Sequence, residues 1–299
     1  MVVEKINLGF VIVTYNSADC IGRLLQSLPT IKNVIVIDNN STDKTCEIVK
    51  SFGCELIANK HNQGYGAGVN QGIKLLYDKC DYFFVLNPDI IIKSLKLDII
   101  DLQKYGIIQP LVLLPNRNVN VEELKMNVLG FVYPLNYNCT PKIKSKKETT
   151  FFSGSAFVLN KKTLKKVGYF DESLFLYYED VDYAIRCNSA NEKILFNPNI
   201  IVEHDYKNSI GNKNKKKWIL KNRKIIANRY FKNIWRKLLF IKKQKQDLHT
   251  LTENEKNVFT AYIKPELLLG FHTKQFFKIT RLLINVIAIP YSFIIKLFI

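Results

Sequence analysis

The sequence lacks the features that mark several common classes of protein. Its 299 residues include six cysteines, which are scattered along the chain and form no CxxC pair. This distribution argues against structural disulfides and a zinc site, and it fits a reducing compartment. We also expect no signal peptide, because Glu4 and Lys5 come early and the apolar run at 8–13 is too short. We therefore expect a cytoplasmic protein.

The familiar phosphate-binding signatures are missing too. Gly64, Gly66 and Gly68 have the spacing GxGxG, which is not the GxGxxG of a Rossmann fold, and the GK[ST] of a P-loop is absent. Glycines at a helix entry still let the backbone approach a ligand, and a helix N-terminus attracts phosphate. The glycine segment alone does not identify its ligand, and no nucleic-acid-binding motif is visible elsewhere.

Acidic residues are scarce in one part of this basic chain. The formal charge is +18, and residues 205–250 contain 15 Lys and Arg against Asp205 and Asp247. Such a segment suits a membrane surface, a nucleic acid or a phosphorylated substrate, whereas a general bias toward Lys, Asn and Ile is the alternative explanation. The stretch 282–299 is almost wholly apolar, but Pro290 would kink it and its length is marginal for a membrane-spanning helix.

Apolar runs and helical periods alternate along the first part of the chain. Continuous β-rich runs predict buried strands, and apolar residues three and four apart predict the helices between them. The strands are expected at 8–14, 34–37, 55–58, 82–86 and 106–114, and the helices at 18–28, 42–51, 64–77 and 95–104. This alternation predicts an α/β fold with a doubly wound, mostly parallel sheet and flanking helices.

A polar segment at 115–150 interrupts the alternation. It is followed by a strand at 151–160, helices at 161–167 and 178–190, and short strands at 194–196 and 200–202. Residues 1–210 are expected to form one domain, with a nucleotide half at about 1–115 and an acceptor half at about 116–210. Residues 211–299 are expected to form a basic, partly apolar helical region that attaches to a membrane or makes a dimer interface.

Two of the predicted strands end in a carboxylate. The strand at 82–86 stops at Asn87-Pro88-Asp89, because proline cannot donate to a sheet, and the strand at 34–37 runs into Asp38. The carboxyl ends of parallel strands form the ligand-binding edge of an open α/β sheet. Asp89 there suits a divalent metal that also takes phosphate oxygens, and Asp38 suits a ribose hydroxyl or a base. The alternatives are a turn residue and a loop residue, respectively.

Aromatic and acidic residues mark the ends of other predicted elements. Thr14-Tyr15-Asn16 follows the first strand, where the Tyr15 ring can either stack on a base or pack against the next helix. His204 ends the last predicted strand, where its acidic neighbours can orient the ring toward a metal or a pyrophosphate. A structural histidine is the alternative.

Three acids open the predicted helix at 178–190: Glu179, Asp180 and Asp182. Carboxylates are favoured at a helix N-terminus in any case, which is the simpler explanation. Three acids in four positions exceed what capping needs, however. Carboxylates so close together raise one another's pKa, which favours a general base at this position.

Taken in order, six motifs resemble those of the inverting family-2 glycosyltransferases with a GT-A fold, and within them the rhamnosyltransferase-like branch. The resemblance covers roughly residues 8–204. The motifs are VIVTYNS at 11–17, VIVIDNNSTD at 34–43, NQGYGAGVNQGI at 62–73, LNPDI at 86–90, FFSGSAFVL at 151–159 and GYFDESLFLYYEDVDYAIRC at 168–187.

The resemblance implies a role for each matching residue. Asp180 would be the catalytic base, with Glu179 and Asp182 beside it. Asp89 would hold a divalent metal, Mg²⁺ or Mn²⁺, and His204 would contact the metal or the pyrophosphate. The implied nucleotide-sugar contacts are Thr14, Tyr15, Asn16, Asp38, Asn62, Gly64, Asn87 and Asp89. Asn87 replaces the first acid of the DxD motif, as is common in the rhamnosyltransferase-like branch, so this motif supplies only one acid.

The reaction implied is the transfer of a sugar, such as rhamnose, from a dTDP- or UDP-sugar with inversion. The acceptor would be a glycan or a lipid-linked saccharide in cell-surface polysaccharide biosynthesis, and the enzyme would lie peripherally at the inner face of the membrane. Two alternatives remain at this point. A sugar nucleotidyltransferase normally has a Gly-rich, Arg-containing loop where this chain has TYNSADC at 14–20. A non-enzymatic polyanion-binding protein would not need carboxylates at the ends of strands and helices.

Overall fold

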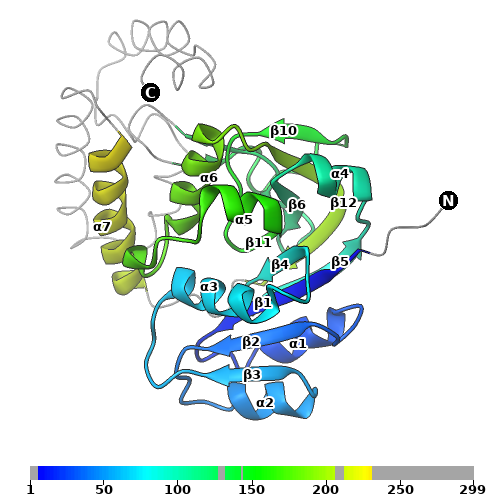
Figure 1. Cartoon of the computed structure of the whole chain (residues 1–299), viewed down its shortest axis with the longest axis vertical. Helices are drawn as coiled ribbons and strands as arrows, with labels where there is room; N and C mark the ends of the chain where they lie inside the picture. The colour runs from blue at the N-terminus through cyan, green and yellow to red at the C-terminus, as the bar shows by residue number, and fades with distance from the viewer. Residues whose placement is uncertain (1–5, 127–131, 143, 206–211, 231–299) are drawn as a thin grey trace, which may run out of the picture. The chain divides into compact units, whose positions relative to one another are not determined.

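An almost fully buried strand, β1 (Leu8–Thr14), is the centre of the parallel part of the sheet (Figure 1). The computed structural model describes residues 6–126, 132–142, 144–205 and 212–230. Strand β1 pairs in parallel with β2 (Val34–Asp38) on one side and β4 (Tyr82–Leu86) on the other, and β3 (Glu55–Ala58) extends the sheet beyond β2. Thr14 lies opposite Asp38, so the carboxyl ends of neighbouring strands meet at one edge.

Helices connect these parallel strands, as the sequence predicted. They are α1 (Ile21–Ser27), α2 (Thr45–Ser51) and α3 (Tyr65–Leu76). Helix α3 packs closely on β1 because Gly68 and Gly72 face this strand. A Cβ atom at Gly68 would lie 2.7 Å from Val13, and one at Gly72 would lie 2.5 Å from Val11. Glycines four residues apart therefore fit the helix against the strand.

The second half of the sheet has mixed strand directions. Strand β11 (Ala156–Asn160) runs antiparallel between β4 and β6 (Ile107–Leu113), and β6 pairs in parallel with β12 (Ile194–His204). The strand order is β10-β12-β6-β11-β4-β1-β2-β3, while β5 pairs with β12 and β7 pairs with β6. The predicted α/β class with a mostly parallel central sheet is confirmed. Within the described residues, β11 pairs antiparallel with its neighbours in the centre of the sheet, and β5, β7 and β10 pair antiparallel with β12 or β6.

Several predicted elements differ from the structure. The strand predicted at 151–160 begins only at Ala156, as β11. Residues Ile90–Leu95 form strand β5, and the helix predicted from residue 95 begins only at α4 (Ile99–Lys104), where Asp98 accepts a hydrogen bond from the Ile100 N–H at 2.9 Å. The two strands predicted at 194–196 and 200–202 are one strand, β12. Pro198 interrupts the apolar pattern without ending the strand, because the pairing with β6 shifts register between Asn197 and Ile201.

Short elements complete the described chain. The strands are β7 (Val119–Val121), β8 (Leu124–Met126), β9 (Val132–Pro134) and β10 (Lys147–Thr149), and the helices are α5 (Lys161–Val167), the 3₁₀ turn η1 (Glu172–Leu174), α6 (Glu179–Ser189) and α7 (Asn212–Tyr230). Among the described residues, no helix is both long and apolar enough to cross a bilayer.

Buried aromatic rings attach α6 to the sheet. Tyr183 of α6 stacks on Phe170 with ring centroids 4.3 Å apart, and Phe170 packs on Phe157 of β11 at 5.8 Å. Phe152 adds a further ring 4.7 Å from Phe157. Burial of a side chain of this size contributes roughly 1.5–3 kcal/mol. The start of α6 is therefore fixed relative to the end of β4, which pairs with β11.

The chain groups into two compact units. One covers Met1–Met126 and Pro134–Arg223, and the other covers residues 127–133 and 224–299. The main sheet, helices α1–α6 and the part of α7 up to Arg223 belong to the first unit. The domain boundary near residue 210 stays a prediction, and the apolar tail at 282–299 lies outside the described residues.

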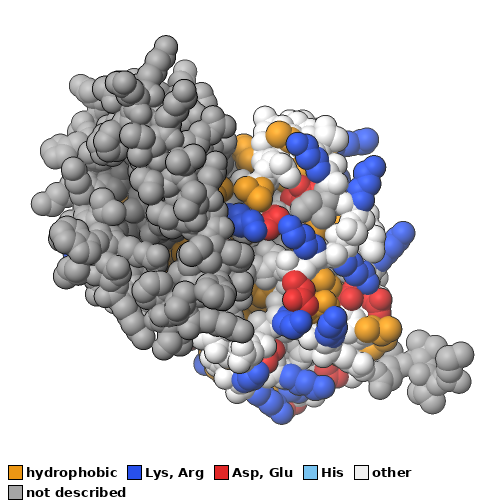
Figure 2. Space-filling model, turned by 90° about the horizontal axis from the view of Figure 1, so that it is seen from above, with side chains coloured by type: hydrophobic (Ala, Val, Ile, Leu, Met, Phe, Trp, Pro, Cys, Tyr) orange, Lys and Arg blue, Asp and Glu red, His pale blue; other side chains and the backbone are white. Residues whose placement is uncertain are grey.

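The described surface in one view carries charges of both signs. Figure 2 shows Lys and Arg side chains with Asp and Glu side chains between them. Most of the basic segment 205–250 lies outside the described residues. The charge excess that the sequence places there is therefore not tested by this surface.

Candidate active site

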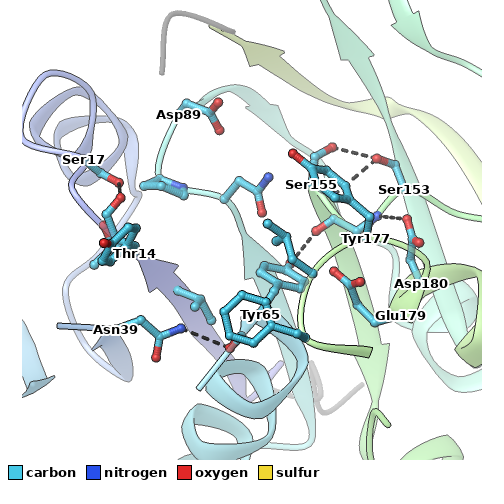
Figure 3. Close-up of a pocket in the computed structure, with 18 of the residues that line it drawn as sticks. Thr14, Ser17, Asn39, Tyr65, Asp89, Ser153, Ser155, Tyr177, Glu179 and Asp180 are labelled. Carbon is cyan, nitrogen blue, oxygen red and sulfur yellow. Dashed lines mark hydrogen bonds between the residues drawn. The ribbon is translucent and has the colours of Figure 1, made fainter. Parts of the chain in front are cut away.

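A pocket of about 320 Å³ lies where the parallel strands end. Residues from seven separate stretches of the chain line it. They are Val13–Tyr15, Ser17 and Cys20; Asn39; Asn62, Gly64 and Tyr65; Asn87–Asp89; Ser153–Ser155; Phe175–Asp180; and His204. Figure 3 shows Thr14, Ser17 and Asn39 at one side of this pocket and Glu179 and Asp180 at the other. The space between the two sides is therefore where two reactants can meet.

The first side combines one exposed ring with buried polar atoms. Tyr15 is 43% exposed, so its ring is available to a ligand. Thr14 is buried, and its Oγ1 has no hydrogen-bond partner among the described residues. Asn39, which the sequence analysis did not select, donates from Nδ2 to the Gly64 carbonyl at 3.0 Å. Its position directly after Asp38 at the end of β2 is the signal that could have identified it.

Asp38 and Asn16 do not line the pocket. Asp38 is buried, and its carboxylate accepts hydrogen bonds from the Ser41 N–H at 2.8 Å and the Ser41 hydroxyl at 2.5 Å. Asn16 Oδ1 accepts from the Thr42 N–H at 2.8 Å. Both side chains therefore hold the loop after β2, which agrees with the loop alternative for Asp38. Their predicted contacts with a nucleotide stay predictions.

The glycine segment approaches the protein's own backbone. Gly64 has φ +92°, and a Cβ atom there would lie 2.3 Å from the Phe175 carbonyl oxygen. The next amide, Tyr65 N–H, donates to that carbonyl at 2.7 Å, and Asn62 Oδ1 accepts from the Gly64 N–H at 2.9 Å. These amides at the entry of α3 are thus occupied within the chain. Asn62 and Gly64 still line the pocket, and their predicted contact with a nucleotide stays a prediction.

Asp89 and His204 come together from the ends of two strands. Asp89 follows β4 and His204 is the last residue of β12, and His204 Nε2 lies 3.1 Å from Asp89 Oδ2. The other oxygen, Asp89 Oδ1, is buried and has no hydrogen-bond partner in the described part of the chain. Asn87 lines the pocket beside them. The pair offers a free carboxylate oxygen and an imidazole to a cation.

The cation site has few protein ligands. Within residues 6–126, 132–142, 144–205 and 212–230, no group of three or more His, Cys, Asp or Glu residues could hold a metal ion. Mg²⁺ and similar ions are often held by one or two carboxylates together with substrate phosphates. The Asp89–His204 pair fits a cation that a substrate helps to bind, and it does not fit a closed structural metal site.

Two backbone amides hold Asp180 at the opposite side of the pocket. Its Oδ2 accepts from the Gly154 N–H at 2.8 Å and its Oδ1 from the Val181 N–H at 2.8 Å. Gly154 is held in turn by the Tyr65 hydroxyl, which donates to its carbonyl. Burial raises the pKa of Asp180, and the two amide hydrogen bonds oppose this rise. Gly154 and Tyr65 were not predicted as site residues, although they lie in the motifs at 151–159 and 62–73.

Glu179 is in a less favourable environment for a charge. Its side chain is 6% exposed, and its Oε2 has no hydrogen-bond partner in the described chain. Burial, followed by the nearby charge of Asp180, raises the pKa of Glu179 well above its ordinary value. Within this pair we therefore expect Asp180 to ionise first, because the amides of Gly154 and Val181 both donate to its carboxylate.

Asp182 lies apart from the pocket. It is 1% exposed, and its carboxylate pairs with Arg186 at 2.8 Å, one turn further along α6. Asp182 is also not among the residues that line the pocket. Asp182 therefore helps to hold α6, whereas Glu179 and Asp180 face the pocket.

Comparison with known proteins gives a family match. The family model described as "Glycosyl transferase family 2" matches residues 10–168, which is more than half of the chain. The chain is 28% identical over 238 residues to an N-acetylglucosaminyl-diphospho-decaprenol L-rhamnosyltransferase from Mycobacterium tuberculosis, which covers 68% of this chain and 78% of that protein. It is also 27% identical over 201 residues to the Low-salt glycan biosynthesis hexosyltransferase Agl10 from Haloferax volcanii. That match covers 63% of this chain and 64% of that protein.

Solved structures share the fold. The structure of GalNAc-T7 with UDP, GalNAc and Mn²⁺ matches with a TM-score of 0.62 and 13% identity, over 87% of this chain and 54% of that one. S. aureus TarS residues 1–349 match with a TM-score of 0.51 and 17% identity, over 87% of this chain and 76% of that one. The chain thus spans under two thirds of the length of both the hexosyltransferase and GalNAc-T7. The predicted GT-A-type fold and the predicted family resemblance are confirmed.

Proposed function

The chain belongs to glycosyl transferase family 2, and from this premise we propose that it transfers a sugar, with inversion, from a nucleoside diphosphate donor to an acceptor hydroxyl. The observation that carries the proposal is one pocket with two different ends. One end has Tyr15 and the Asp89–His204 pair, and the other has the paired carboxylates Glu179 and Asp180. A donor with a negatively charged leaving group suits the first end, and a nucleophile that must lose a proton suits the second.

The donor end has the groups that a nucleoside diphosphate needs. The exposed Tyr15 ring can stack on a base, and the unpartnered Thr14 hydroxyl can bond to a ribose or phosphate oxygen. Asp89 and His204 would hold a divalent cation such as Mg²⁺ or Mn²⁺. A cation held there would offset the negative charge that develops on the leaving diphosphate. The donor is proposed to be a dTDP- or UDP-sugar, and the names of the rhamnosyltransferase and hexosyltransferase relatives favour rhamnose or another hexose.

Asp180 is the base in this proposal. It removes the proton from an acceptor hydroxyl, and the resulting oxygen attacks the anomeric carbon on the face opposite the diphosphate. The bond to the leaving oxygen breaks as the new glycosidic bond forms, so the configuration inverts without a covalent enzyme intermediate. The amide donors from Gly154 and Val181 keep the carboxylate oriented, and burial keeps its pKa closer to working pH than that of an ordinary aspartate.

Asp180→Asn tests the role of the base. We expect the sugar transfer rate to fall by roughly 10²- to 10⁴-fold, while a nucleoside diphosphate still raises the unfolding temperature as it does for the wild type. Asp98→Asn is the matched control, because Asp98 also accepts from a backbone amide but does not line the pocket. Full transfer activity in the Asp180→Asn variant would remove Asp180 from this role. Thermal shift with UDP, dTDP and GDP, with and without manganese, tests the donor class in the same samples.

The acceptor is proposed to be a glycan or a lipid-linked saccharide in surface polysaccharide synthesis, at the cytoplasmic face of the membrane. The support is the basic segment 205–250 and the apolar stretch 282–299, together with relatives whose names include a diphospho-decaprenol acceptor. The alternative is that the apolar tail forms a dimer interface between two copies of the chain. Flotation with anionic vesicles, of the full chain and of a chain ending at Lys243, distinguishes membrane attachment from dimerisation. Equal partitioning of the two chains into the vesicle fraction would exclude the tail as a membrane anchor.

A further inference from the structure

The loop Phe175–Tyr178 has an unusual backbone and lies next to the proposed base. All four residues line the pocket, and α6 with Glu179 and Asp180 begins directly after them. Tyr177 and Tyr178 have left-handed backbone angles, with φ +68° and +74°. Such angles in residues other than glycine cost on the order of 1–3 kcal/mol each and persist only where the surroundings impose them. The loop therefore requires support from outside itself.

Helix α7 supplies much of that support through one amide side chain. Asn222 is completely buried, and its Nδ2 donates to the carbonyl oxygens of Leu174 at 3.0 Å, Leu176 at 2.9 Å and Tyr177 at 2.7 Å. An amide has two N–H donors, so the three carbonyls share them. Asn222 Oδ1 has no hydrogen-bond partner in the described residues. The amide nitrogen of Asn222 is therefore the group that satisfies the surrounding carbonyls.

Two further contacts fix the start of the loop. Trp218, one helical turn before Asn222, stacks on Phe175 with ring centroids 4.6 Å apart and an interplanar angle of 26°. Lys221 lies over the Trp218 ring at 4.8 Å. From the other side, the Tyr65 N–H of α3 donates to the Phe175 carbonyl at 2.7 Å. The loop is thus held between the entry of α3 and one face of α7.

We propose that Asn222 and Trp218 of α7 are positioning residues for sugar transfer: they hold the loop Phe175–Tyr178 so that Asp180 meets the acceptor hydroxyl. This inference rests on the proposed function. It assigns a role in the active site to the start of the basic C-terminal region, which lies beyond the residues that the family model matches. Because the residues act on the loop at the acceptor end, their loss changes turnover and acceptor use more than donor binding.

Asn222→Ala in the full chain is the main test. Asn160→Ala is the matched control, because Asn160 is also buried and donates to a backbone carbonyl, that of Leu102 at 2.7 Å, but does not line the pocket. Both variants are expected to unfold at lower temperature. Only Asn222→Ala is expected to increase amide hydrogen exchange across residues 174–180. It should also lower kcat by roughly 10- to 100-fold, since small misplacements of reacting groups cost this much, with an unchanged affinity for UDP or dTDP.

Trp218 provides a second pair of variants if Asn222→Ala does not fold. Trp218→Ala removes the stacked ring and should raise loop exchange and lower kcat, whereas Trp218→Phe keeps a ring on Phe175 and should restore both. Loop exchange and kcat like those of Asn160→Ala, in either Asn222→Ala or Trp218→Ala, would overturn the proposal. If the wild type transfers no sugar from any donor tested, the proposed function fails, and the exchange data alone then decide whether α7 holds the loop.

Discussion

Glu179 is a buried carboxyl whose replacement by glutamine should stabilise the protein in a pH-dependent way. The side chain is 6% exposed and its Oε2 has no hydrogen-bond partner among the described residues. Burial and the charge of Asp180 raise its pKa well above the ordinary glutamate value of 4.5. Glu179→Gln keeps the shape of the side chain and removes its ability to ionise.

The sign and size of the effect follow from proton linkage. Below about pH 4.5 the carboxyl is protonated in both the folded and the unfolded chain, so the difference between variant and wild type is constant. As the pH rises from 4.5 to the raised folded-state pKa, the unfolded wild type ionises while the folded wild type stays protonated, and the loss is complete once the pH has passed the folded-state pKa. The wild type therefore loses stability relative to the variant, by about 1.4 kcal/mol for each unit by which the pKa is raised.

Denaturant unfolding of both proteins between pH 4 and pH 8 measures this difference. A new glutamine N–H without an acceptor would shift all values equally, so the slope against pH is the diagnostic quantity. Glu192→Gln is a control for which the stability difference from the wild type should change with pH in the opposite direction. Although burial raises the pKa of Glu192, hydrogen bonds and charge from Lys166 and Thr163 lower it overall. The stability that Glu192 contributes is present above its unfolded pKa and is lost as the pH falls through the folded one. A Glu179→Gln difference that is flat with pH, or that falls, would refute the reasoning.

Three other outcomes are expected. Asp89→Ala should remove the extra rise in unfolding temperature that manganese gives in the presence of UDP, as thermal shift would detect; an undiminished rise would contradict a cation at Asp89. Gly72→Ala should destabilise the protein by about 1–3 kcal/mol, because its Cβ would lie 2.5 Å from Val11, whereas Gly22→Ala, with its nearest atom at 3.6 Å, should be neutral or stabilising in the same denaturation assay. The transfer rate kcat should rise with pH through a pKa above 3.8, the ordinary aspartate value, because burial raises the pKa of Asp180 and the base must be ionised; a rate that is independent of pH or falls over pH 4–7 would contradict this assignment.

Much of the sheet could be predicted from the sequence because its strands are continuous apolar runs. Strands β1, β3 and β4 begin and end where the pattern predicted, and α5 does so too. Strand β5 was missed because the pattern for 90–95 does not distinguish a strand from the start of a helix. Its strand conformation depends on pairing with β12, more than a hundred residues away. The direction of β11 was missed for the same reason.

The functional site could likewise be predicted only in part from the sequence. The positions of Asp89 and Asp180 at the ends of a strand and a loop follow from local signals, proline in one case and clustered acids in the other. The sequence does not show that Asp38 bonds to Ser41 or that Asp182 bonds to Arg186. Those contacts depend on which way each side chain points, and that direction is set by the packing of whole elements.

By itself, the sequence determined the fold class, the family and the residue types at the pocket, because apolar periodicity and short motifs are local properties. Only the tertiary structure decided which of the predicted carboxylates face one another across a shared space. It also brought His204 to within 3.1 Å of Asp89 and the amide of Asn222 to three carbonyls next to the proposed base. Such contacts join residues far apart in the chain, so they exist only after the sheet and the helices have packed.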